Sequence, residues 1–188
     1  MLTPVHPLLQ AVLVLTVVTA AIYDLRYRRI PNWLVLGGLV LGVGLNTTLY
    51  AVAGMQFAGL TRALLGMGLA LLIYVPLYAL RAMGAGDAKL MAAVGSIVGP
   101  GNWIGLFVVT ALIGGLVAVV VLLFASRIRK TFWNLGWIIN EVLHFRAPYH
   151  SSEELDVRSA KAMRMPHGAV IALGAIVFLV LRAIYGGK

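Results

Sequence analysis

The chain has 188 residues, of which 61% are hydrophobic and only 11% are charged, and its mean hydropathy is +0.96. A water-soluble domain of this length could not bury so much apolar surface, so the composition predicts an all-α, polytopic membrane protein. The sequence has no cysteine, which excludes disulfides, thiolate catalysis and cysteine-based zinc sites.

About six transmembrane helices are predicted, in a single domain over residues 1–188. The first apolar segment covers about residues 8–23 and is followed by Asp24, a basic turn and Pro31. Proline has no N–H to lose at the start of a helix, so Pro31 suits the opening of the second segment, at about 33–53.

The third and fourth segments, at about 60–80 and 87–99, flank a turn that contains Gly84, Gly86 and Asp87. The glycines lack the Cβ atoms that would hinder a sharp turn or close contact with another chain. Asp87 falls near the first helical turn, where free N–H groups and the helix dipole favour a negative charge. At roughly 13 residues, the fourth segment is short for a membrane crossing. We expect the following turn to complete it, or the bundle to enclose it.

The last part of the chain contains a fifth segment at about 103–125 and a sixth at about 166–185, which opens with Pro166. Between them, residues 126–164 are predicted to form a cytoplasmic loop. Its first half mixes aromatic and polar residues, a pattern typical of a helix that lies in the membrane interface.

The basic residues indicate an orientation. If Asp24 and Asp87 face the cytoplasm, only Arg62, Arg182 and Lys188 of the 15 lysines and arginines lie on the other side. This asymmetry follows the positive-inside rule. Because six spans are predicted, both termini then lie on the non-cytoplasmic side. The net charge of +9 is therefore interpreted as an orientation signal, and nucleic acid is not an expected partner.

Asp24 and Asp87 are the only carboxylates attached to the apolar segments, because the other four lie in the polar loop. Two neighbouring aspartates that share one proton suit peptide hydrolysis, since the ionised one activates water and the protonated one polarises the carbonyl. This chemistry requires no metal or cofactor, and no acid or second histidine is spaced with His167 for a metal site. Two simpler interpretations stay open: Asp24 as a solvated charge at a helix end, and Asp87 as a helix cap. Lys89 is interpreted as an orientation charge or interfacial anchor, with a catalytic base as the alternative. His167 is interpreted as a polar contact within the bundle in preference to a ligand.

Three stretches together resemble the type IV prepilin peptidases, which are GxGD intramembrane aspartic proteases. Gly84-Ala85-Gly86-Asp87-Ala88-Lys89-Leu90 resembles the GxGD segment, and Asp24 with Ile30-Pro31-Asn32 resembles the region of the first catalytic aspartate. Pro166-His167-Gly168 resembles the proline–glycine stretch of the last membrane helix. The sequence departs from the family at His167, where other residues are commoner.

The resemblance implies an endopeptidase that removes the leader of prepilins at the cytoplasmic face of a prokaryotic inner membrane. The implied partners are a prepilin substrate and membrane lipid, and no cofactor is implied. Asp24 and Asp87 would form the catalytic dyad. The residues expected to bind substrate or shape the site are Gly84, Gly86, Lys89, Pro31, Pro166 and Gly168.

The compact size is similar to the peptidases of tight-adherence (Flp-type) pilus systems and to the archaeal preflagellin peptidases. The larger bifunctional relatives carry paired Cys-x-x-Cys motifs and also methylate the new pilin terminus. Because this chain lacks cysteine, the resemblance does not imply methylation.

Two other classes of membrane protein could also have these aspartates and glycine-rich helices. A small proton-coupled transporter needs intramembrane carboxylates and broken, glycine-rich helices, although both aspartates are expected at one membrane face. A non-catalytic membrane scaffold would use them only as helix caps.

Overall fold

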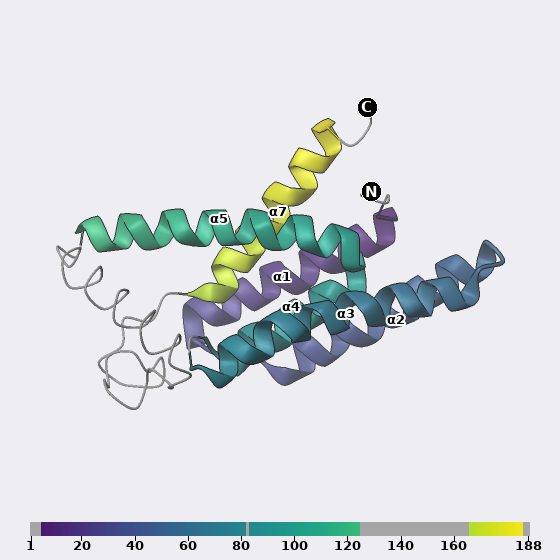
Figure 1. The fold of residues 1–188 in the computed structure, drawn as a ribbon, viewed down its shortest axis with the longest axis horizontal. Coiled ribbons are helices and arrows are strands. Elements are labelled where there is room, and N and C mark those ends of the chain that lie inside the picture. Colours follow the sequence, from purple (N-terminus) through teal and green to yellow (C-terminus); the bar gives the residue numbers. More distant parts are fainter. Residues whose placement is uncertain (1–4, 82, 125–165, 186–188) are drawn as a thin grey trace, which may run out of the picture.

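The computed structural model describes residues 5–81, 83–124 and 166–185, and these residues form helices without a strand (Figure 1). The helices are α1 (Pro7–Tyr27), α2 (Asn32–Val52), α3 (Gln56–Ala79), α4 (Ala85–Val98), α5 (Pro100–Phe124) and α7 (His167–Tyr185). The predicted all-α class is confirmed. The interfacial helix expected within residues 126–164 lies outside the described residues.

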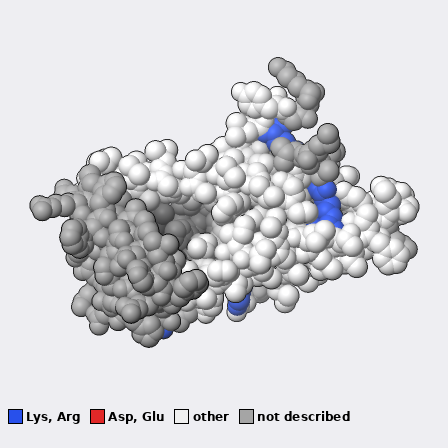
Figure 2. All heavy atoms as spheres, viewed as in Figure 1, with Lys and Arg blue, Asp and Glu red and all other residues white. Residues whose placement is uncertain are grey.

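Five of these helices, all except α4, are long and apolar enough to cross a membrane. Large apolar side chains are exposed along them, including Leu15, Leu36 and Leu112, as expected where lipid rather than water surrounds the protein. Figure 2 shows a face on which charged residues are sparse among those described. The polytopic prediction is therefore confirmed, and the fourth segment is the one that falls short of a span.

Helix α4 forms the centre of the bundle. It contacts each of the other five described helices, and every residue from Leu90 to Val98 is buried. At the crossing with α3, a Cβ added to Gly95 would overlap the carbonyl oxygen of Gly66, and a Cβ on Gly66 would overlap that of Gly95. Two glycines therefore permit this backbone contact. Enclosure within the bundle, one of the two outcomes expected for the short segment, is confirmed.

The helix ends that carry the candidate site residues lie at the same end of the bundle. In Figure 1, the end of α1 and the starts of α2, α4 and α7 lie at one end of the bundle. The start of α1 and the end of α7 lie at the opposite end. The segments that carry the aspartates, Pro31 and Gly168 thus come to one end.

Candidate active site

Asp24 lies inside the last turn of α1, because this helix continues to Tyr27 rather than ending near residue 23. The backbone N–H of Arg28 donates to the Asp24 carbonyl at 2.8 Å, and Arg28 adopts a left-handed conformation that ends the helix. The side chain of Asp24 is half-buried. It is held at a fixed helix end instead of on a mobile turn.

The carboxylate of Asp24 reaches the start of α7. Its Oδ2 accepts a hydrogen bond from the backbone N–H of Gly168 at 2.7 Å. Gly168 is the second residue of α7, so this N–H is one of the donors that a helix leaves unpaired at its N-terminus. A carboxylate at this position satisfies the donor and interacts favourably with the helix dipole. Asp24 therefore caps a helix that begins far along the chain.

Gly168 also provides the space for this contact. A Cβ at position 168 would lie 3.0 Å from both the Cβ and the Oδ2 of Asp24, closer than ordinary van der Waals contact. Pro166 precedes the helix, and its carbonyl accepts from the N–H of Val170 at 3.3 Å. Proline and glycine thus set the start of α7 against Asp24.

Asp87 is the third residue of α4 and is only 8% exposed. With Gly84 as N-cap, it occupies the position from which an acidic side chain can reach back to the N-cap amide. Burial raises the pKa of the Asp87 carboxyl to about 6, and the charge of Asp24 raises this pKa as well. The charge of His167 and the backbone N–H of Gly84 lower the pKa but do not cancel the effect of burial.

The two aspartates are therefore electrostatically coupled, although they come from α1 and α4. Such a pair holds one proton more readily than two free carboxylates do. The described residues contain no group of three or more His, Asp or Glu side chains that could hold a metal ion.

Two further side chains lie near the pair. His167 begins α7 and influences Asp87 electrostatically; the sequence had favoured it as a polar contact within the bundle. Tyr74 of α3 is 5% exposed and lies within electrostatic reach of Asp87. Sequence reasoning missed Tyr74, although it is the only side chain with a polar group between Arg62 and Tyr78.

The two glycines of the GxGD turn act through close packing. A Cβ on Gly84 would lie 3.3 Å from Asp87 Oδ2, and a Cβ on Gly86 would lie 3.3 Å from the Cβ of Ile30. Neither glycine has a positive φ angle, so of the two roles expected for these glycines the structure shows the close contact. Gly84 leaves room beside the carboxyl group, and Gly86 lets the turn before α2 approach α4.

Pro31 and Lys89 lie near the pair but do not face it. Pro31 is the N-cap of α2, and its carbonyl accepts from the N–H of Leu34 at 3.2 Å. Lys89 is exposed and its Nζ donates to Asn32 Oδ1 at 3.1 Å. Residues two apart on a helix point to nearly opposite sides, so Lys89 turns away from the buried Asp87.

Comparison with known proteins identifies the family of this chain. Residues 11–119 match the type IV leader peptidase family, and this range is more than half of the 188 residues. The chain belongs to the type IV leader peptidase family. The resemblance found in the sequence is thereby confirmed, and the matched range includes both Asp24 and Asp87 but ends before α7. No curated protein and no solved structure matches the chain.

Membership of a leader peptidase family favours a peptidase over the transporter and the scaffold. The family also implies a prepilin-like substrate. Five helices suited to crossing a membrane make this type IV leader peptidase a multi-pass membrane protein.

Proposed function

We propose that this type IV leader peptidase is an aspartic endopeptidase in which Asp24 and Asp87 form the catalytic dyad. The observation that carries the proposal is the coupling of a buried Asp87 to an Asp24 held by the Gly168 amide. A perturbed carboxyl group with a specific charged partner is a signature of functional sites. No other carboxylate occurs among the described residues.

The two aspartates take different roles. Asp24 Oδ2 accepts an N–H at a helix start, which suits the ionised member of the pair. Asp87 is buried and its pKa is raised to about 6, which suits the member that holds the proton. Asp24 is thus the base and Asp87 the acid.

Hydrolysis follows from these roles. Asp24 takes a proton from water while the water oxygen attacks the scissile carbonyl carbon, and Asp87 gives its proton to the carbonyl oxygen. The resulting tetrahedral diol collapses as the amide nitrogen receives the proton held by Asp24 and the C–N bond breaks. One diol hydroxyl returns its proton to Asp87 as the carbonyl reforms, so both carboxyl groups regain their starting states.

The substrate is a prepilin-like protein whose leader is removed at the cytoplasmic face of a prokaryotic inner membrane. The excess of basic residues near the aspartates supports this orientation, with both termini on the other side. The apolar helix of such a substrate would lie in the bilayer and bring its leader junction to the interface. The same chemistry serves an archaeal preflagellin peptidase. We propose that methyl transfer is absent, since the cysteine motifs of the bifunctional relatives are missing.

The test is leader removal from a co-expressed prepilin-like protein, followed on a gel and by mass spectrometry. Asp24→Asn and Asp87→Asn should each abolish cleavage, whereas Asp156→Asn, an identical change in the polar loop, should not. The mature product should carry an unmethylated N-terminus. Cleavage that persists in both dyad variants would refute the proposal. A pH-dependent ion flux without cleavage in any variant would instead favour a transporter.

A further inference from the structure

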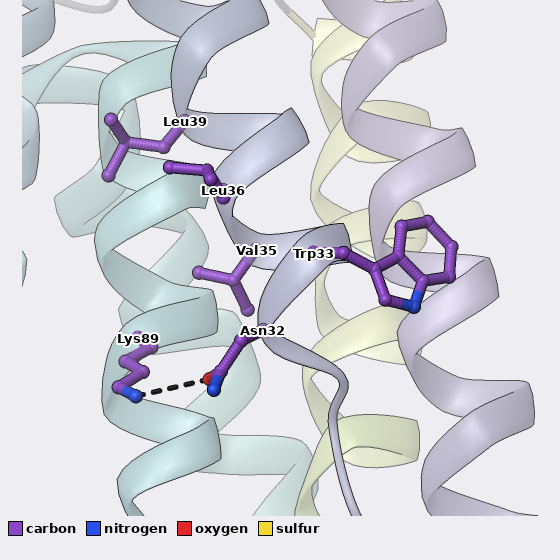
Figure 3. Close-up of a pocket in the computed structure, with 6 residues that line it drawn as sticks. All are labelled: Asn32, Trp33, Val35, Leu36, Leu39 and Lys89. Carbon is purple, nitrogen blue, oxygen red and sulfur yellow. Dashed lines mark hydrogen bonds between the residues drawn. The ribbon is translucent and has the colours of Figure 1, made fainter.

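A pocket of about 340 Å³ lies between the start of α2 and the first turns of α4. Figure 3 shows its lining, which is formed by Asn32, Trp33, Val35, Leu36, Leu39 and Lys89. The pocket is an open groove with a mostly apolar surface. It does not include Asp24 or Asp87, so the proposed peptidase mechanism leaves it without a role.

One end of the groove is polar. Lys89 reaches from α4 toward α2 and donates to Asn32 Oδ1 at 3.1 Å (Figure 3). An ammonium group has three N–H donors and the Asn32 amide has two more, so this pair retains donors for a further ligand. Among the described residues, Lys89 forms no ion pair with a carboxylate. The polar end is therefore suited to an anion.

The rest of the groove is apolar and follows α2. From Asn32 to Leu39 the helix rises about 10 Å, and Leu36 is 62% exposed on the way. Trp33 turns toward α1, where its ring meets that of Tyr23 edge-on with centroids 6.0 Å apart. Aromatic side chains of this kind collect at the headgroup level of a bilayer. The groove thus leads from the interface into the hydrocarbon region.

We propose that this groove binds one anionic phospholipid, with its phosphate at Lys89 and Asn32 and an acyl chain along Val35, Leu36 and Leu39. The charge and the apolar lining match the two parts of such a lipid. This proposal does not depend on the assigned peptidase chemistry.

The chain has no cysteine, so a single introduced thiol can report on the groove. Leu36→Cys, labelled with a fluorophore, is reconstituted in vesicles that contain brominated phosphatidylglycerol or brominated phosphatidylcholine. Gly37→Cys is the matched control at the same depth, since a side chain there meets nothing within 4 Å. The measurement is the relative association of each lipid, obtained from quenching titrations.

We expect brominated phosphatidylglycerol to associate roughly fivefold more strongly than phosphatidylcholine at position 36, the effect of one lysine near a membrane surface. Position 37 should show no such preference. Lys89→Gln should remove the preference at position 36, whereas Arg29→Gln, which removes another exposed cation near the start of α2, should retain it.

Three results would overturn the proposal. The first is equal quenching by both lipids at position 36, and the second is a preference that survives Lys89→Gln. The third is a label that neither lipid quenches but that an added prepilin-like protein shields, because a polypeptide would then occupy the groove.

Discussion

The Oδ2 atom of Asp24 accepts a hydrogen bond from the backbone N–H of Gly168 at 2.7 Å, across 144 residues of sequence. This bond joins the last turn of α1 to the first turn of α7. One carboxylate therefore completes a helix start and also lies within electrostatic reach of the second aspartate. The first four predictions concern this site.

Gly168→Ala should impair catalysis while the backbone donor is retained. The new Cβ would lie 3.0 Å from Asp24 Oδ2, so the carboxylate or the start of α7 must shift. A displacement of about 1 Å in a catalytic group can reduce the rate by roughly 100-fold. Leader cleavage by purified protein measures this loss.

Gly44→Ala is the matched control for this substitution, because a Cβ at position 44 of α2 meets nothing within 4 Å. Its cleavage rate should equal that of the wild type. If Gly168→Ala were equally active, the contact between Gly168 and Asp24 would have no functional role.

The cleavage rate should fall as the pH rises through about 6. In the proposed mechanism Asp87 must hold a proton, and burial raises the pKa of Asp87 to about 6, so its reactive form is lost above that pH. The pH profile of kcat/KM, which reports groups of the free enzyme, gives the measurement.

His167→Gln should shift the fall in kcat/KM, the descending limb of the pH profile, to higher pH. The charge of His167 lowers the pKa of Asp87, so its removal lets that pKa rise. His6→Gln, at the N-cap of α1, is the control and should leave the profile in place. A limb that moves to lower pH in His167→Gln would contradict this electrostatic account.

Asp87→Asn should be more stable than the wild type at pH 7 although it is inactive. The Asp87 pKa is raised from 3.8 to about 6 in the folded protein, so the favourable contribution of its neutral form is present below about 3.8. That contribution is lost as the pH rises through 6. Asparagine keeps a similar shape without the buried charge.

Thermal unfolding in detergent at pH 4 and pH 7 measures the difference. The stabilising effect of Asp87→Asn should be largest at pH 7 and should shrink toward pH 4. A variant that is less stable than the wild type at both values would show that the Asp87 carboxylate is not penalised by burial.

Gly66→Ala should destabilise the bundle by about 2–3 kcal/mol, since overpacking a tight contact forces the backbones apart. Its Cβ would overlap the carbonyl oxygen of Gly95. Gly68→Ala in the same helix meets nothing within 4 Å and should unfold at or above the wild-type temperature. Equal unfolding temperatures for the two variants would contradict the glycine contact.

Local sequence patterns correctly predicted that Asp87 lies at the start of a helix. Two glycines followed by an aspartate before an apolar run indicate a helix start, and Asp87 does lie in the first turn of α4. The short length of the fourth segment left its enclosure as one of two expected outcomes, and the structure shows that one. The end of the first segment was wrong by about one turn, because Asp24 and Arg26 continue α1, with Arg26 as a basic residue in its last turn.

The contacts between helices could not be predicted from such local sequence patterns. Nothing in the sequence pairs the carboxylate of Asp24 with the amide of Gly168, since that bond depends on how α1 and α7 pack. The family resemblance placed Lys89 among the site residues, yet its spacing of two residues from Asp87 turns it toward Asn32. Tyr74 approaches Asp87 only because α3 packs on α4.

The central position of α4 limits where a substrate can be cut. Among the described residues, this helix packs against five neighbours and its residues 90–98 are buried. In the proposed mechanism a substrate would therefore approach Asp87 at the N-terminal end of α4. A scissile bond must therefore lie at the border of a hydrophobic helix, in unwound chain, and a bond deep within such a helix would escape cleavage.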